Sequence, residues 1–207
     1  MMFEDGPIVS ITRITVPATK ISDVTKLHQT VMSHFPKIKT SYRARQTMGV
    51  LFQITDLSVD TAGLLIASSV LPQNNLRAEA ATVELEFHEG DMVSFVLDAN
   101  ITKRLPTEQT PGRASKHGRL VPLTTPAEQR EWLDRKGLQH GFQVMKATFG
   151  PAPLPVRKGQ HGIVVRAVRV QAEVEITDPE LFTEAVTDGI GRGRAFGCGL
   201  VNVFEAV

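Results

Sequence analysis

The chain has 207 residues and nearly balanced charge, with 23 Lys and Arg against 22 Asp and Glu. This length fits one large domain or two small ones, and a formal net charge of +1 by itself indicates neither a nucleic-acid nor a membrane partner. The single cysteine, Cys198, excludes an intramolecular disulfide and argues against a cysteine-based zinc site. The first residues lack the pattern of a signal peptide, and the longest uncharged run, residues 61–76, is too short to span a bilayer. We therefore expect a cytoplasmic protein with no membrane contact.

In the first half of the chain, hydrophobic periodicity predicts one helix and several strands. Ser22 and Asp23 are residue types that cap helices, the apolar residues after them recur at helical spacing, and Pro36 ends the pattern. A basic loop is expected at residues 37–46. Strands are expected where β-branched and alternating apolar residues gather, at residues 7–16, 48–55, 63–70 and 81–87.

The second half follows a similar order, with a more clearly marked helix at residues 124–137. There Thr125 is the expected N-cap, Pro126 occupies the first position, Glu128 lies three residues after the cap, and Gly137 is expected at the end. Another helix is expected to begin at Asp178 and Pro179 and to run to Val186. Strands are expected at residues 92–101, 141–150, 154–156, 163–176 and 200–204, with a long basic loop at 103–120 and a hairpin tip at 157–162.

This order of elements predicts an α+β fold made of two tandem ferredoxin-like (RRM-like) βαββαβ domains. The domains would comprise residues 1–89 and 91–207, and the first would have a weak second helix. Small sheets of this kind bind RNA in some proteins and nothing in others, so the fold alone assigns no function.

The net charge conceals three basic segments, at residues 24–55, 103–119 and 154–170. The first and third contain no acidic residue, and the second contains only Glu108. Segregated charge of this kind can build a positive surface on a neutral protein, whereas one such segment alone would indicate only solvated loops. Together the three segments favour an anionic partner, and nucleic acid in particular.

The segment GIGRGRAFGCG, residues 189–199, contains five glycines, two arginines and no acid. It follows an expected helix and precedes a strand, the reverse of the order in Rossmann and Walker loops, so it is not a nucleotide-cofactor motif. Two interpretations remain open. The loop is either an anion cradle built from Arg192, Arg194 and backbone N–H groups, or a tight turn that packs its glycines against the neighbouring helix.

His28 falls within the apolar stripe of the first expected helix. Such a histidine is either a packed core residue or, beside an acid-free basic segment, a half-buried general acid or base. The sequence shows no metal-binding motif and no cofactor motif. If the chain acts on phosphodiesters, we expect it to work without metal and to use an RNA 2′-OH as the nucleophile, with fixed cations at the phosphate.

Three stretches resemble the CasE-type CRISPR-associated endoribonucleases of type I-E systems. GIGRGRAFGCGLVNV after a DPELF helix resembles their C-terminal signature, and LHQTVMSHFP resembles their N-terminal helix with its histidine. VSFVLDANITKR followed by LVPLTTPAEQREWLDRKGLQHGFQV resembles their central segment. These matches span most of the chain in the same order.

The resemblance implies a metal-independent endoribonuclease that cleaves precursor CRISPR RNA at the base of the repeat hairpin. The products would carry a 2′,3′-cyclic phosphate and a 5′-OH, and the protein would keep the mature guide RNA as a subunit of Cascade. His28 takes the position of the family's catalytic histidine. The RNA contacts expected from the resemblance and the basic segments are Lys39, Arg43, Lys103, Arg104, Arg157, Lys158, Gly191, Arg192, Gly193 and Arg194.

The chain departs from some members of that family at Thr25, where they have a tyrosine three residues before the histidine. A second catalytic group is therefore left open among Lys26, Lys39, Tyr42 and Arg43. Two other functions stay open. One is a non-catalytic RNA-hairpin-binding subunit of the same fold, with His28 in the core. The other is an enzyme of small anionic substrates that uses the glycine loop as a phosphate nest.

Overall fold

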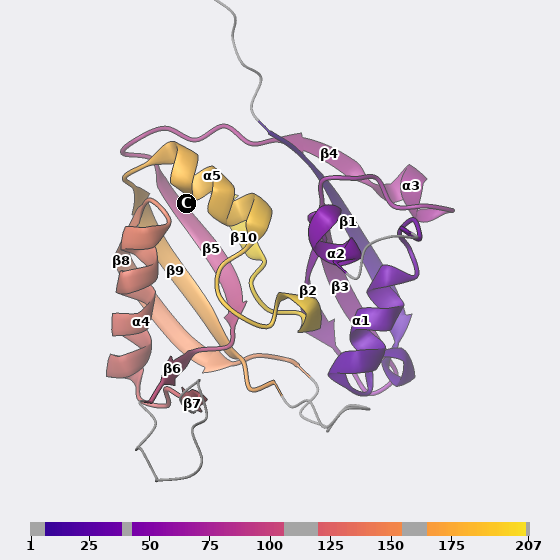
Figure 1. Cartoon of the computed structure of the whole chain (residues 1–207), viewed down its shortest axis with the longest axis horizontal. Helices are drawn as coiled ribbons and strands as arrows, with labels where there is room; N and C mark the ends of the chain where they lie inside the picture. The colour runs from indigo at the N-terminus through magenta and orange to yellow at the C-terminus, as the bar shows by residue number, and fades with distance from the viewer. Residues whose placement is uncertain (1–6, 39–42, 106–119, 155–164, 206–207) are drawn as a thin grey trace, which may run out of the picture.

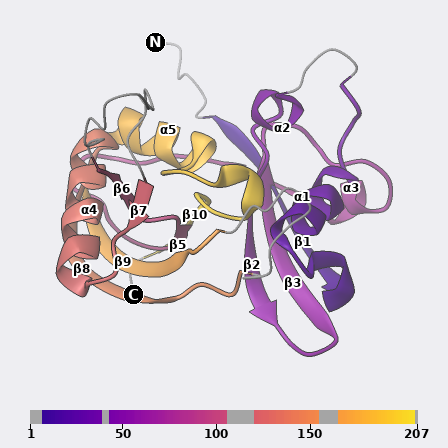
Figure 2. The ribbon, with the colours of Figure 1, turned by 60° about the horizontal axis from the view of Figure 1, so that its bottom comes forward.

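Two four-stranded antiparallel sheets lie side by side in the computed structural model, which describes residues 7–38, 43–105, 120–154 and 165–205 (Figures 1 and 2). The first sheet has the order β2-β3-β1-β4, and the second has the order β10-β5-β9-β8. In each, the first and third strands of the unit are central and the fourth pairs with the first. Both units therefore have ferredoxin-like topology, which confirms the predicted fold class.

The elements of the first unit are β1 (Ile8–Pro17), η1 (Ala18–Ile21), α1 (Val24–Met32), α2 (Ala44–Thr47), β2 (Leu51–Leu57), β3 (Thr61–Ser68), α3 (Leu76–Glu79) and β4 (Ala81–Glu84). Helix α1 begins where Asp23 accepts hydrogen bonds from the N–H groups of Thr25 and Lys26, each at 2.9 Å. The predicted second helix of this unit is the single turn α3. Residues 37–46 were predicted to be all loop, but α2 occupies the end of that segment.

The elements of the second unit are β5 (Met92–Ala99), β6 (Thr102–Arg104), β7 (Leu120–Pro122), α4 (Pro126–Gln139), β8 (Phe142–Pro151), β9 (Val168–Ile176), α5 (Pro179–Asp188), η2 (Arg194–Phe196) and β10 (Val201–Glu205). Helix α4 begins with the predicted capping box of Thr125 and Glu128. The prediction of a loop throughout residues 103–120 was wrong at its ends, because β6 pairs with β7 there. No strand begins at Leu154, and the predicted hairpin tip at residues 157–162 lies outside the described residues.

The prediction that Gly137 ends α4 was wrong, since the helix continues to Gln139. The glycine with the left-handed backbone that follows it is Gly141, at φ +69°. A Cβ at Gly137 would lie 2.3 Å from the carbonyl oxygen of Phe142 and would also meet the Phe142 ring. Gly137 therefore allows α4 to lie close to β8, and it does not break the helix.

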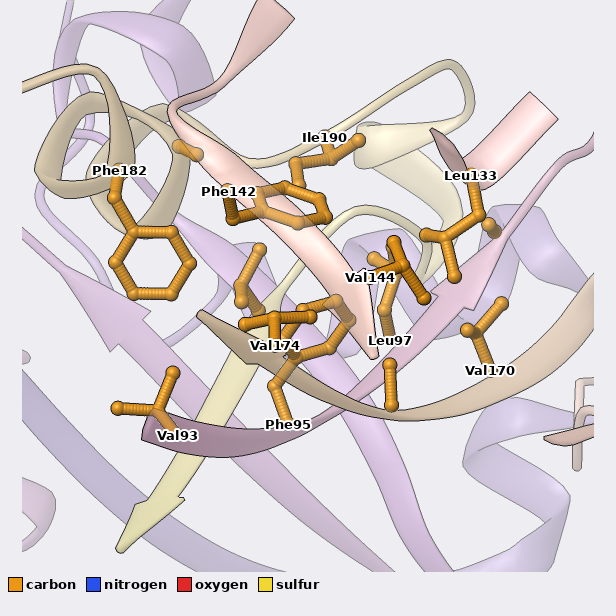
Figure 3. Packing of buried hydrophobic residues seen from close by; sticks show 14 of the residues in the cluster. Val93, Phe95, Leu97, Leu133, Phe142, Val144, Val170, Val174, Phe182 and Ile190 are labelled. Carbon is orange, nitrogen blue, oxygen red and sulfur yellow. The ribbon is translucent and has the colours of Figure 1, made fainter. Parts of the chain in front are cut away.

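The second sheet carries a core of aromatic and branched side chains beneath α4 and α5 (Figure 3). Phe142 makes edge-to-face contacts with Phe95, at 5.6 Å between ring centroids, and with Phe182, at 5.9 Å. These three rings are almost fully buried, and each such burial contributes about 1.5–3 kcal/mol. The packing fixes α5 and therefore the starting point of the glycine loop.

The core of the first unit is completed by residues from the second. Leu27 and Val31 of α1 pack with Phe52 of β2, and the same cluster includes Leu154 and Cys198. On the other face of the first sheet, buried side chains such as Leu51 pack with Leu200. The two units therefore share apolar contacts on both sides of β2, and the proposed boundary between residues 89 and 91 stays a prediction.

Candidate active site

His28 lies on α1, beside buried Leu27, and faces the glycine loop. Its ring meets the ring of Phe196 edge-on, with 6.4 Å between centroids and 64° between planes. Phe196 belongs to η2, the short helix inside residues 189–199, which lies against α1 and β2 in both views (Figures 1 and 2). The two most prominent sequence motifs, far apart in the chain, are thus adjacent in space.

The environment of His28 favours its neutral form. Burial lowers the pKa of the imidazole, a hydrogen-bonding contribution from the Ala195 backbone raises it, and the charge of Arg45 lowers it again. The net shift is downward from the ordinary histidine value of about 6.5. His28 is therefore mostly neutral near pH 7 and able to accept a proton.

Nδ1 of His28 is buried and has no well-formed hydrogen bond within the described residues. Thr25, one helical turn earlier, has a hydroxyl that is likewise buried and without a partner among those residues. His28 as a whole is half-buried, so part of the residue remains accessible at the edge of the core.

Arg45 is a site residue that the sequence did not single out. It lies on α2, and its Nη1 donates a 2.6 Å hydrogen bond to the carbonyl of Val50. Burial and then Arg194 lower the pKa of Arg45, while Asp188 raises it. The guanidinium of Arg45 is thus close enough to affect His28 and is itself affected by the glycine loop. Its only signal in the sequence was its membership of the acid-free segment at residues 24–55.

All five glycines of residues 189–199 have positive φ, from +79° to +92°. Gly197, at φ +88°, lies where the loop packs against α1. A Cβ there would lie 2.8 Å from Leu154 Cδ2, 3.3 Å from Leu27 Cδ2 and 3.4 Å from the Phe52 ring. The loop is therefore a tight turn, as one interpretation expected, but at Gly197 it packs against α1 and β2.

The two arginines of the loop have different environments. Arg194 donates from Nε to the Gly191 carbonyl at 3.1 Å and from Nη1 to the Asp188 carbonyl at 2.7 Å. It therefore ties the loop to the C-terminal end of α5, where the helix dipole favours a positive charge. Arg192 is exposed. Arg192 is the freer of the two to contact an anion.

The other predicted contacts lie in several places. Lys103 is 3.0 Å from Glu128 Oε1, so it forms an exposed ion pair with the capping box of α4. Arg43, just before α2, and Arg104 are exposed and already have interactions within the protein. Lys39, Tyr42, Arg157 and Lys158 lie outside the described residues.

Of the candidates for a second catalytic group, Lys26 is exposed and lines a shallow groove with residues such as Pro17 and His34.

Two further observations concern the described ranges alone. Within residues 7–38, 43–105, 120–154 and 165–205, no three His, Cys, Asp or Glu side chains gather in a way that could hold a metal ion. No helix in these ranges is both long and apolar enough to cross a bilayer.

Comparison with known proteins gives consistent matches. A family model described as "CRISPR associated protein" matches residues 9–204. The chain is 32% identical over 127 residues to the CRISPR-associated endoribonuclease Cse3 of Thermus thermophilus; the alignment covers 55% of this chain and only 56% of that relative.

Solved structures match over nearly the whole chain. Cse3 of Thermus thermophilus, bound to an RNA that represents a pre-cleavage complex, has a TM-score of 0.72 at 21% identity, covering 96% of this chain and 100% of the other. Cas6e of Escherichia coli has a TM-score of 0.71 at 24% identity, covering 95% and 100%. These likenesses show the shared fold, and the family model covers well over half of the chain. The chain therefore belongs to the CRISPR-associated protein family, which confirms the resemblance found in the sequence.

Proposed function

We propose that this protein is a metal-independent endoribonuclease that cleaves precursor CRISPR RNA at the base of the repeat hairpin. The observation that carries the proposal is the contact of His28 with the glycine loop, where the charge of Arg45 also acts on the imidazole. A neutral imidazole beside a fixed guanidinium can take a proton from a nucleophile and offset charge on phosphate. The endoribonuclease name of the Thermus relative supports the same reaction.

In the proposed reaction, Nε2 of His28 accepts the proton of the 2′-OH next to the cut. The 2′-oxygen then attacks the adjacent phosphorus, and the bond between phosphorus and the 5′-oxygen breaks. The leaving 5′-oxygen takes up a proton, from solvent or from the imidazolium that has formed. The products are a 2′,3′-cyclic phosphate and a 5′-OH, so no water is consumed and no metal is required.

Arg45 supplies positive charge where the phosphorus gains negative charge. Its hydrogen bond to the Val50 carbonyl fixes the guanidinium before substrate arrives, and pre-positioned charge is the most effective kind. Arg192, Arg194 and the backbone of Gly191 and Gly193 would hold neighbouring phosphates. Arg43, Lys103 and Arg104 would extend this surface, and Lys39, Arg157 and Lys158 remain predictions for the hairpin stem.

After cleavage the protein would keep the mature guide RNA and act as a subunit of Cascade. A structural match to an RNA-guided surveillance complex, with a TM-score of 0.66 and 95% of this chain covered, supports this assignment. The rival function is a non-catalytic subunit that only binds the hairpin. The burial of Nδ1 and the contact with Phe196 are the observations in its favour, because a packed histidine would show both.

The deciding experiment is a cleavage assay on labelled repeat-hairpin RNA in EDTA. Wild-type protein should cut the RNA, and it should fail on an RNA that carries 2′-deoxy at the cut site. His28→Ala should bind the hairpin with unchanged affinity and leave it intact. A cut that persists in His28→Ala, or one that needs Mg²⁺, would overturn the mechanism. Tight binding without any cut by wild type would establish the rival function.

A further inference from the structure

A basic cavity of about 410 Å³ lies between α4 and the glycine loop. One wall is α4, which contributes Arg135, Lys136 and His140. The other wall is the loop, which contributes Arg192 and Arg194. None of the described residues that line the cavity is acidic. Of the residues that line the cavity, only Gly191, Arg192 and Arg194 were assigned to RNA from the sequence.

The positive groups of the cavity act on one another. The pKa of Lys136 is lowered by burial, then by Arg135, Arg194 and Arg192. The pKa of His140 is lowered by burial, then by Lys136 and Arg194. The only partner that Lys136 has among the described residues is the neutral amide of Gln139, at 2.8 Å. Like charges held together without an acid are the arrangement that a bound anion stabilises.

The loop wall adds neutral donors. The backbone N–H groups of Gly191 and Arg192, two residues that line the cavity, donate to no acceptor within the described part of the chain. Gly191 and Gly193 have φ values of +87° and +81°, and such glycine-rich turns can direct successive N–H groups toward an anion. The side chains and the loop backbone therefore offer the same kind of ligand two independent sets of contacts.

Size and lining limit what the cavity can hold. Its volume is in the lower part of the range for small-ligand sites, so it suits one nucleotide and is too small to admit a duplex. Trp132 lines it but is only 4% exposed, and its ring packs near Gly191, so it offers no stacking face. Asn100 and Gln139 line it as well, and their amides can donate to or accept from a base or sugar.

Arg194 links this cavity to the candidate active site. Its charge acts on Lys136 in the cavity and on Arg45, which in turn acts on His28. A strand with its reacting phosphate at His28 would therefore come under the positive charge of Arg45 and Arg194, and Arg194 also lines the cavity. We propose that the cavity between α4 and the glycine loop binds the phosphate of an unpaired nucleotide in the RNA strand that flanks the cut. This inference rests on the proposed function for the identity of the RNA.

The test is a binding measurement on an uncleavable hairpin RNA, 2′-deoxy at the cut site, with unpaired flanks on both sides. Lys136→Gln and Arg135→Gln should each weaken binding several-fold. Each should also lower the slope of log affinity against log salt by about 0.7, the value for one lost contact with a single strand. Lys136→Arg, which keeps the charge, should bind like wild type. The matched control is Lys146→Gln, because Lys146 is an exposed lysine on β8 whose partner is Glu173.

A second set of RNAs locates the contact. Removing one of the two flanks should abolish the difference between wild type and Lys136→Gln. The proposal is overturned if the difference persists on a hairpin without flanks, if Lys146→Gln weakens binding equally, or if Lys136→Gln binds like wild type. Failure of the proposed function would look different. Wild-type protein would then leave an all-ribose hairpin RNA uncut, but the RNA affinities of wild type and Lys136→Gln could still be compared.

Discussion

Arg169 of the second sheet donates a 2.6 Å hydrogen bond from Nη2 to the carbonyl of Ile54 in the first sheet. The same guanidinium makes two 2.8 Å hydrogen bonds to Asp98, whose side chain is only 1% exposed. Ile54 lies on β2, the edge strand of the first sheet, next to a shift in its register with β3 between Ile54 and Asp56. One buried ion pair therefore fixes the position of the two sheets relative to each other beside the site.

Replacing Arg169 with Met should lower the free energy of unfolding by about 3 kcal/mol, because it leaves Asp98 buried without a partner. Adding Asp98→Asn should restore part of the loss. Urea denaturation gives both values. The control is Lys146→Met, which breaks an exposed pair and should cost less than about 1 kcal/mol. Equal losses in the two single variants would contradict the assigned role of Arg169.

Arg45→Gln should slow cleavage about 10²-fold, the usual effect of losing one pre-positioned charge at the reacting group. It should also move the acid limb of the pH–rate profile to higher pH, because the charge of Arg45 lowers the pKa of His28. Arg45→Lys keeps the positive charge, so its acid limb should lie at the same pH as that of wild type. Single-turnover rates across the pH range measure both effects. A slower reaction with an unmoved limb would mean that Arg45 does not act on His28.

Gly197→Ala should destabilise the protein by about 3 kcal/mol, through the left-handed backbone and through overlap with Leu154. It should also reduce cleavage, because it pushes η2 away from α1. Gly90→Ala is the matched control, since Gly90 has the same φ of +88° but nothing within 4 Å of the added Cβ. That variant should lose only about 1 kcal/mol. Similar losses by urea denaturation would show that packing at Gly197 contributes little.

Stability should fall as the pH decreases from 7 to 5. The pKa values of His28, His34 and His140 are all lowered, chiefly by burial, so the unfolded chain binds protons that the folded chain excludes. This stabilisation is fully present above the unfolded value of about 6.5 and is lost as the pH falls through the folded values. Thermal unfolding measured across this range should show that the melting temperature depends less steeply on pH in His28→Gln than in wild type. An unchanged dependence would contradict the burial of His28.

Cys198 should resist alkylation in the folded protein at pH 8. Its thiol is completely buried, and burial followed by the charge of Asp98 raises its pKa to about 12. Very little thiolate is then present to react. Iodoacetamide followed by mass spectrometry should show modification only in urea. Rapid modification in native buffer would mean that the loop around Cys198 opens.

Local signals in the sequence predicted the helices that carry the site. Asp23 and Thr125 cap α1 and α4 as their residue types indicate, and Asp178 accepts a hydrogen bond from the N–H of Leu181 at the start of α5. The alternation of apolar residues located most of the long strands to within a few residues, but β9 begins at Val168, well after the expected start at residue 163. These features depend on neighbours in the chain, which a sequence shows directly.

Features that depend on distant contacts were missed. A glycine after a helical pattern predicts a helix end at Gly137. The actual reason for the glycine is its close contact with Phe142, which is a tertiary contact and leaves no pattern in the sequence. Arg45 looked like one basic residue among several, and only the fold brings it near His28. The pairing of β6 with β7 was also missed, since three-residue strands have too short a pattern to detect. The meeting of His28 with Phe196 follows from how the two units pack.

The shared core also sets an order of events during synthesis. The cluster around Leu27 and Phe52 includes Cys198, which follows both residues by more than 140 positions in the sequence. The strands of the first unit can form early. Phe196, whose ring contacts His28, belongs to the glycine loop and is synthesised much later. A nascent chain therefore cannot complete the surroundings of His28 before residues 189–199 have been synthesised.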